Sequence, residues 1–379
     1  MQIYYWCPFL SNVATINSVK SSATAIKKYF GKTYDNNVVI LNSCGEWSFL
    51  KNNILNIKIE NILPIDFYKY LPKLGFIQSR FSFIIIFLTN FFPLLFNIKK
   101  NKPNFLIIHL LTLLPILLSP LISKNTKIIL RISGLPKMNY FRRFIWKTFS
   151  KYIYLITAPT ELTAKDLIRL NIFDPKKISV LRDPVIKCRD IHIKKREILD
   201  ESFLKNNYYL SIGRLTDQKN FKFLIKVFSE NINKFKNKKL VIIGEGENYN
   251  LLKEMILYYK MQDNIFLVGF KKNIYRYINN CLAVISVAEY EDPGFTLIEA
   301  AYLRKKIITS LVKNGPAEMQ LKGDMCYFFK HNNEDDLIDK IIISENDTNF
   351  KVKLTKALKF SKNFSMFSHF KVLKTLISQ

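Results

Sequence analysis

The sequence has few cysteines, and none of them follows a spacing that would make it structural or metal-binding. Its 379 residues contain five cysteines, widely scattered, without a CxxC or a similar pair. This absence argues against a disulfide framework or a zinc site, and it favours a reducing compartment. The opening MQIYYWCPF also lacks a basic segment followed by an apolar run, so we predict no signal peptide.

Acidic residues are missing from one long stretch of the chain. None occurs between Asp66 and Glu161, where fourteen lysines and arginines fall. The whole chain carries a net charge of +28, of which residues 1–190 contribute +18. Such a field requires an anionic partner, which could be nucleic acid, anionic lipid or a phosphorylated substrate. Charge alone does not choose among these three, but no recognisable nucleic-acid-binding motif accompanies it.

Two uncharged stretches lie inside this acid-free region. Residues 81–98 and 103–123 each approach the roughly 20 apolar residues that span a bilayer. The second stretch is better explained by a buried strand at residues 104–109 that runs into a core helix, and Pro115 and Pro120 interrupt it. We therefore expect core structure or shallow attachment to one leaflet in preference to spanning helices.

A basic and aromatic segment follows at residues 139–155, NYFRRFIWKTFSKYIYL. A helix of this composition can rest at the level of lipid headgroups. It can equally be a solvated helix with an aromatic core face, and the sequence leaves both alternatives open.

The overall pattern alternates short apolar runs with segments of helical composition, as in doubly wound α/β proteins. Two such alternations follow one another, which predicts an N-terminal domain over residues 1–190 and a C-terminal domain over 191–360. Residues 361–379 are expected to form a last helix, either crossing back onto the first domain or closing the second. The predicted strands are 38–42, 105–109, 127–132, 155–158, 208–212, 239–243, 265–268, 283–287 and 306–309, and the clearest predicted helices are 18–29 and 160–170.

Two cations and a glycine follow the first strand of the second half. Residues 211–220 read SIGRLTDQKN, so Gly213 allows a sharp turn while Arg214 and Lys219 stand where the sheet ends. Ligands of such sheets bind outside the carboxyl ends of the strands. A guanidinium and an ammonium there suit a diphosphate leaving group. The next strand is followed by Gly244 in a G-x-G turn, a weak signal that gains weight only from these neighbours.

The most informative segment is residues 286–301, SVAEYEDPGFTLIEAA. A strand ends, an acidic Pro-Gly turn follows, and a helix is predicted to begin near Phe295. The backbone N–H groups of Gly294, Phe295 and Thr296 would then form an anion site at the helix N-terminus. Glu299 lies one turn into the helix, where its carboxylate can bind vicinal ribose hydroxyls. Glu291 precedes the turn and can reach the hydroxyls of an attached sugar.

Together, the segments SIGRLTDQKN, VIIGEGE, VGFKKN and EDPGFTLIEA resemble the C-terminal domain of family-4 retaining glycosyltransferases, over roughly residues 205–330. The resemblance implies the GT-B fold, an α/β architecture of two Rossmann-like domains whose parallel sheets face an interdomain cleft. It also implies a hexosyltransferase that needs neither metal nor cofactor, because the nucleotide-sugar is a substrate. This agrees with the lack of a DxD element beside a strand.

The family's site residues map onto this sequence by motif. The resemblance implies that Arg214 and Lys219 hold the donor diphosphate, that Glu291 contacts the donor sugar, and that Glu299 holds the ribose. Residues 269–271, including Phe270 and Lys271, would line the nucleobase pocket. We take Glu291, Arg214 and Lys219 as the candidate catalytic residues.

The N-terminal half departs from the family pattern. Many members have a glycine-rich loop after the first strand, whereas residues 8–15 read PFLSNVAT. Many also place a histidine at the end of an inner strand, near the donor sugar. This sequence offers His109 at one strand end, and Arg131 and Ser133 at another. His109 in an apolar run can equally be a core histidine.

These observations predict an enzyme that transfers a sugar from a UDP- or GDP-type donor to an acceptor hydroxyl with retention. The basic N-terminal half favours a lipid-linked saccharide acceptor of bacterial surface polysaccharide (lipopolysaccharide, O-antigen or capsule). It also predicts a cytoplasmic protein attached peripherally to the inner face of the cytoplasmic membrane, with no nucleic-acid partner. The alternatives are a GT-B-related sugar-nucleotide epimerase or hydrolase, and a non-enzymatic basic protein that binds nucleic acid or membrane. The oligomeric state stays open.

Overall fold

The computed structural model describes the chain except for residues 12–13, 31–36, 49–56, 74–75, 137, 200–206, 236–237 and 379. Asn12 and Val13 of the loop after the first strand thus lie outside the described residues. The chain divides into two compact units. Unit 1 comprises Met1–Pro184 and Met366–Gln379, and unit 2 comprises Val185–Ser365. The N-terminal domain was predicted to end at residue 190, and the division falls between Pro184 and Val185.

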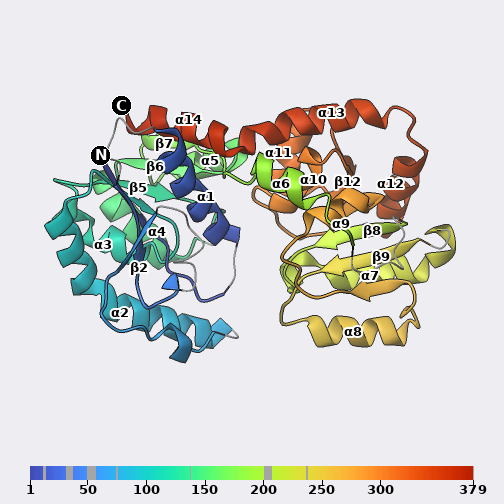
Figure 1. Ribbon diagram of the computed structural model, residues 1–379, viewed down its shortest axis with the longest axis horizontal. Coiled ribbons are helices and arrows are strands. Elements are labelled where there is room, and N and C mark those ends of the chain that lie inside the picture. Colours follow the sequence, from blue (N-terminus) through green and yellow to red (C-terminus); the bar gives the residue numbers. More distant parts are fainter. Residues whose placement is uncertain are drawn as a thin grey trace. The chain divides into compact units, whose positions relative to one another are not determined.

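Unit 1 is built on a parallel sheet of seven strands in the order β3-β2-β1-β4-β5-β6-β7 (Figure 1). Its strands are β1 Gln2–Trp6, β2 Asn37–Asn42, β3 Lys58–Asn61, β4 Phe105–Ile108, β5 Lys127–Arg131, β6 Leu155–Ala158 and β7 Ile178–Val180. Its helices are α1 Ala14–Tyr29, α2 Phe76–Asn101, α3 Leu113–Ile122, α4 Tyr140–Phe149, α5 Glu161–Arg169 and α14 Met366–Ile377.

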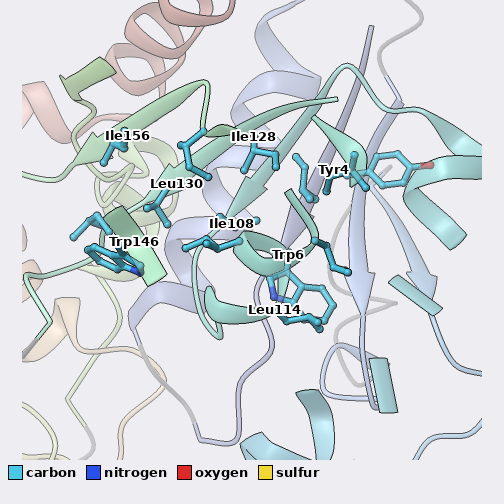
Figure 2. Packing of buried hydrophobic residues seen from close by; sticks show 14 of the residues in the cluster. Tyr4, Trp6, Ile108, Leu114, Ile128, Leu130, Trp146 and Ile156 are labelled. Atoms are coloured by element: carbon cyan, nitrogen blue, oxygen red, sulfur yellow. The ribbon is translucent and has the colours of Figure 1, made fainter. Parts of the chain in front are cut away.

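Both faces of this sheet are covered, and this explains why its strands are apolar throughout. Because side chains alternate along a strand, β1 directs Ile3 and Tyr5 to the face covered by α1 and α14. It directs Tyr4 and Trp6 to the opposite face, where α2, α3, α4 and α5 pack. Figure 2 shows the second cluster, with Trp146 of α4 among residues of β1, β4, β5 and β6.

The last helix of the chain, α14, belongs to unit 1 and packs against α1. Its His369 is buried, and one ring nitrogen lies 2.7 Å from the Ser22 hydroxyl of α1. The other ring nitrogen lies 2.7 Å from the carbonyl oxygen of Arg182. A hydrogen bond of 2.8 Å also joins Ser22 to the hydroxyl of Tyr5 on β1. A chain of polar contacts therefore ties the end of the sequence to its first strand.

Unit 2 repeats the plan with a parallel sheet of six strands in the order β10-β9-β8-β11-β12-β13. Its strands are β8 Tyr208–Ile212, β9 Lys239–Ile243, β10 Ile265–Leu267, β11 Ala283–Ser286, β12 Lys306–Ser310 and β13 Tyr327–Phe329. Its helices are α6 Cys188–Lys194, α7 Phe221–Glu230, α8 Tyr249–Tyr258, α9 Tyr275–Asn280, α10 Phe295–Tyr302, α11 Gly315–Leu321, α12 Glu334–Asn346 and α13 Phe350–Ser361.

The nine strands predicted from the sequence are confirmed to within one residue at each end, as are the two parallel α/β alternations. Strands β1, β3, β7 and β13 were not among the predicted strands. Of these, β3, β7 and β13 are short outer strands of three or four residues, whereas β1 lies inside the sheet between β2 and β4. An outer strand carries less of the apolar signal that marks a strand paired on both sides.

Candidate active site

Strand order determines where a ligand site can form in unit 2. The chain steps outward from β8 through β9 to β10, and then returns to place β11 on the other side of β8. The loops that follow β8 and β11 therefore leave neighbouring strands in opposite directions. Ligands of open parallel sheets bind at this kind of switch point. The two most informative sequence motifs lie in these two loops.

Glycines allow the loops after β8 and β9 to approach closely. A Cβ at Gly244, where φ is +152°, would lie 1.8 Å from the carbonyl oxygen of Gly213. A Cβ at Gly213 would lie 2.9 Å from Cε of Lys219. The Gly213 N–H donates to the carbonyl of Ile243 at 3.0 Å, which holds the two loops together. The stem of Lys219 therefore lies directly on the backbone of Gly213, and a side chain at this position would have to displace it.

The structure joins two of the predicted site residues directly. Lys219 Nζ forms an ion pair with Glu291 Oε1, and both side chains are largely shielded from solvent. The backbone of the two loops supports this pair, because the Glu289 N–H donates to the carbonyl of Gln218 at 2.9 Å. The amide of Gln218 in turn donates to the carbonyl of Tyr290 at 3.0 Å. A cation from one loop thus meets a carboxylate from the other at the switch point.

A third loop holds the backbone of Glu291, and the sequence reasoning missed it. After β12, the Gly315 N–H donates to the carbonyl of Glu291 at 2.8 Å, and Asn314 forms a parallel bridge with Glu291. A Cβ at Gly315 would lie 2.2 Å from the carbonyl oxygen of Pro293. The signal in the sequence was the Asn-Gly-Pro run at residues 314–316, shortly after a predicted strand.

Helix α10 begins at Phe295, as predicted, directly after Gly294. Gly294 has a φ of +87°, a left-handed conformation that favours glycine. The first N–H groups of a helix have no partner within it. Those of Phe295 and Thr296 therefore stand at the positive end of the helix dipole. The acidic Pro-Gly turn positions Glu291 just before this helix end.

Glu299 is buried one turn into α10, where Tyr275 donates a hydrogen bond of 3.1 Å to its Oε1. Burial raises the pKa of Glu299 to about 7, and the Tyr275 hydrogen bond and the charge of Lys187 offset only part of this effect. Its carboxyl group therefore titrates near neutral pH. Sequence reasoning missed Tyr275, because no motif distinguishes it from the surrounding aromatic residues.

The remaining donor-side residues lie around these three loops. Arg214 is exposed, with Nη2 3.5 Å from Oε1 of Gln218. Phe270 is exposed and follows Gly269, whose carbonyl accepts from the Gly244 N–H at 3.0 Å. Nζ of Lys271 lies 5.8 Å from the ring centroid of Tyr277. The structure thus pairs Lys219 with Glu291, Glu299 with Tyr275 and Arg214 with Gln218.

Unit 1 has its own switch point between β1 and β4, and His109 directly follows β4 there. The histidine is buried, and its ring centroid lies 6.1 Å from that of Tyr5. Its Nδ1 has no hydrogen-bond partner among the described residues. Burial and the charge of Arg131 lower its pKa to about 3. His109 is therefore neutral at physiological pH.

Arg131, the last residue of β5, lies inside unit 1. Its Nη2 is 2.8 Å from Asp183 Oδ1, and the two side chains are 2% and 4% exposed. Ser18 also donates a hydrogen bond to Asp183. Burial alone would raise the pKa of Asp183, but the charge of Arg131 and these hydrogen bonds lower it overall. The Ser133 hydroxyl, in the loop after β5, is shielded and has no partner within the described part of the chain.

The part of the chain that carries the donor-side motifs is similar to a known protein family. Residues 194–360 match the family described as "Glycosyl transferases group 1". The match covers 167 of the 379 residues and nearly all of unit 2. The recognition made from the sequence motifs is thereby confirmed for most of unit 2.

Two curated relatives show how far the similarity extends along the chain. An uncharacterised glycosyltransferase of Methanocaldococcus jannaschii is 30% identical over 249 residues, 59% of each chain. A Campylobacter jejuni enzyme is 22% identical over 227 residues, 58% of each chain. The printed name of the second is N-acetylgalactosamine-N,N'-diacetylbacillosaminyl-diphospho-undecaprenol 4-alpha-N-acetylgalactosaminyltransferase. Both alignments span less than two thirds of the relative's length.

A solved structure matches the whole fold. Anabaena HepE, crystallised in complex with UDP-glucose, aligns with a TM-score of 0.71, covering 100% of both chains at 12% sequence identity. The protein therefore has the GT-B fold of two parallel-sheet α/β domains, as the motifs implied.

Proposed function

We propose that this chain is a glycosyltransferase that moves a sugar from a nucleotide-sugar to an acceptor hydroxyl, with retention at the anomeric carbon. The ion pair between Lys219 and Glu291, beside the N-terminus of α10, carries the proposal. It places a cation, a carboxylate and free backbone donors at the switch point of a unit that matches the glycosyl transferases group 1 over residues 194–360. HepE, with the same fold, was crystallised with UDP-glucose, which supports a nucleotide-sugar donor of the UDP or GDP type.

The charges at this site match the charge that develops in the reaction. The bond between the anomeric carbon and the diphosphate breaks, and a bond from that carbon to the acceptor oxygen forms on the same face. The departing diphosphate gains negative charge, which Lys219, Arg214 and the first N–H groups of α10 stabilise. The proton of the acceptor hydroxyl passes to an oxygen of that diphosphate. The reaction requires no protein nucleophile.

Each carboxylate has a separate binding role in the proposal. Glu291, next to Lys219, accepts hydrogen bonds from hydroxyls of the donor sugar. Glu299 accepts those of the ribose from inside α10. Phe270 offers an exposed ring on which a nucleobase can stack. The proposal includes no metal or cofactor, so activity should persist in EDTA.

We further propose that the acceptor is a lipid-linked saccharide used in bacterial surface polysaccharide. The Campylobacter relative is named for an acceptor on diphospho-undecaprenol, which is anionic at its head. Residues 1–184, which form most of unit 1, contain 25 Lys+Arg and 8 Asp+Glu, a net charge of +17, so unit 1 offers a positive field to such a group.

The proposal is tested by a panel of UDP- and GDP-sugars with a bacterial membrane extract as acceptor, scored by nucleoside diphosphate release. We expect one donor to be consumed only when the extract is present. Glu299→Ala should lower kcat/KM by at least tenfold. Glu289→Ala, which removes a more exposed carboxylate from the same loop, should stay within about twofold of the parent protein.

Two results would overturn the assignment. Donor consumption without any acceptor would indicate a hydrolase or an epimerase that uses the same nucleotide site. If the Glu299→Ala protein folds and its turnover is unchanged, the donor does not bind at this loop. The anomeric configuration of the isolated product, determined by NMR, separates retention from inversion.

A further inference from the structure

Helix α2 presents a long apolar face to solvent, unlike an ordinary surface helix. Its exposed apolar side chains, each between 54% and 81% exposed, are Ile77, Phe81, Ile84, Leu88, Phe92 and Phe96. We call these six residues the α2 stripe. The opposite face packs Ile86, Leu94 and Ile98 into the core and also buries the polar Ser82 and Asn90. A helix that served only the core of unit 1 would not also expose six bulky apolar side chains along its length.

The α2 stripe is continuous and long. Its members follow one another at intervals of three or four residues, so they share one side of the helix. At 1.5 Å per residue, the stripe runs for about 28 Å. Residues Ile77–Asn101 are long and apolar enough to cross a bilayer by composition, but a third of the most apolar window, 33%, is buried against the protein. A helix packed on one side and apolar on the other is suited to lying in an interface.

A second apolar surface is provided by α4, where Tyr140, Phe141 and Phe144 are 62% to 93% exposed. Both α2 and α4 pack on α3. The pKa of Arg142 on α4 is lowered by burial and also by the positive charge of Arg80 on α2. Arg142 lies in the first turn of α4 and Arg80 in the second turn of α2, so the N-terminal part of each helix combines a guanidinium with exposed apolar side chains.

The charges around the α2 stripe indicate what covers it. Lys99, Lys100 and Lys102 lie at its C-terminal end, Arg80 lies near its N-terminal end, and no acidic residue occurs between Asp66 and Glu161. An apolar stripe with basic residues at its ends matches an anionic leaflet, whose headgroups attract cations while its acyl region accepts the stripe. A second copy of this chain would instead bring two such basic regions together.

We propose that the α2 stripe docks unit 1 onto the surface of an anionic membrane, with α2 parallel to the leaflet and the aromatic residues of α4 beside it. This inference concerns unit 1 alone and does not depend on the donor site in unit 2. For the activity proposed above, docking would bring the enzyme to an acceptor that is itself anchored in lipid.

Flotation of the full chain with phosphatidylcholine vesicles, with and without about 30% phosphatidylglycerol, tests the proposal. The parent protein should float with the anionic vesicles and bind the neutral ones at least tenfold more weakly. Added salt should weaken the anionic binding, since it screens the attraction to the headgroups. The double variant Ile84→Glu with Leu88→Glu should lower anionic binding at least tenfold.

A matched control adds the same two charges elsewhere on the helix. Gln78→Glu with Thr89→Glu changes two polar exposed positions of α2, and its binding should fall by about threefold at most. Circular dichroism and Tm establish that both double variants are folded. Turnover with a soluble saccharide acceptor, where one is found, separates docking from catalysis. Both double variants should turn over this acceptor as fast as the parent protein does.

Three outcomes would overturn the inference. The stripe variant and the control could float equally well. The parent protein could fail to float with anionic vesicles. The parent could instead form a dimer in solution that the stripe variant abolishes, which would assign the α2 stripe to a contact between copies of this chain.

Discussion

The two units share a parallel α/β plan but use their charged residues differently. In unit 2, loops at the switch point bring a lysine and a glutamate from distant parts of the sequence into one shielded ion pair, Lys219 with Glu291. In unit 1, acidic residues are absent from a long segment, and basic residues lie at the ends of an exposed apolar stripe. In the two proposals made above, one architecture serves a ligand site in unit 2 and a docking surface in unit 1.

The units also differ in the polar groups of their interiors. Unit 1 buries an ion pair between Arg131 and Asp183, and it buries His369 between α14 and α1. Unit 2 buries Glu299 at the start of a helix in its proposed site. We infer that the buried polar groups of unit 1 hold its structure together, whereas those of unit 2 serve its ligand. Four predictions test this contrast, from the largest expected effect to the smallest.

The largest effect is expected from Arg131→Met in unit 1. The substitution leaves Asp183 buried without its cation, which costs about 3–5 kcal/mol of unfolding free energy. Urea unfolding measures this loss, and adding Asp183→Asn should restore at least half of it. If the single variant kept its stability and lost only turnover, Arg131 would belong to a catalytic site and the contrast would fail.

The next effect is expected from Lys219→Met in unit 2. Removing one cation that stabilises a developing diphosphate should lower kcat by about 100- to 1000-fold. It should cost less stability than Arg131→Met, because Lys219 is 17% exposed and Arg131 only 2%. Steady-state kinetics and Tm measure the two quantities. The control is Lys222→Met, which removes a nearby lysine paired with exposed Asp217 and should change kcat by less than about twofold. Equal losses in both variants would contradict a specific role for Lys219.

A smaller effect separates two glycines of unit 2. Gly244→Ala forces a Cβ against the carbonyl of Gly213 and should cost about 2–3 kcal/mol. Gly269→Ala at a φ of +70° meets no atom within 4 Å and should cost about 1 kcal/mol, from backbone conformation alone. Hydrogen exchange of peptides from unit 2 measures the loss of stability in each of the two variants. Similar protection in the two variants would show that the loops after β8 and β9 can separate without cost.

The smallest effect is a pH dependence of opposite sign in the two units. Burial lowers the pKa of His369 to about 4. The contribution of His369 to the free energy of unfolding is therefore complete above about pH 6.5 and is lost as pH falls toward 4. The pKa of Glu299 is raised to about 7. Its contribution to the free energy of unfolding is therefore complete below about pH 4.5 and is lost as pH rises through 7. For each group, the free energy of unfolding changes by at most about 1.4 kcal/mol per pH unit.

Two variants isolate these contributions. Relative to the parent protein, His369→Gln should lower Tm most at pH 7 and progressively less as the pH falls to about 4. Glu299→Gln should show its greatest relative gain in Tm above pH 7, because its amide cannot become a buried charge. Parallel Tm profiles for the parent and both variants would contradict the assigned pKa shifts.

Much of the fold could be predicted from apolar periodicity. Runs such as residues 239–243 and 283–287 are short, β-branched and bounded by turn residues, so their strands were found to within one residue. The donor-side motifs likewise predicted the start of α10 at Phe295. Tyr275 could not be predicted, because no local pattern marks it, and the Asn-Gly-Pro run that contains Gly315 marks a turn but not its contact with Glu291, which sheet order creates.

The sequence by itself therefore determined the two α/β alternations, the acid-free basic region and the motifs of the proposed donor site. Local spacing is sufficient for these features, since strands, turns and helix starts depend on neighbouring residues. Only the tertiary structure decided which side of α2 faces outward. Residues 81–98 are apolar on nearly every side, so periodicity assigns them no buried face. Packing against the rest of unit 1 makes that choice: it encloses Ser82 and Asn90 and leaves the α2 stripe exposed.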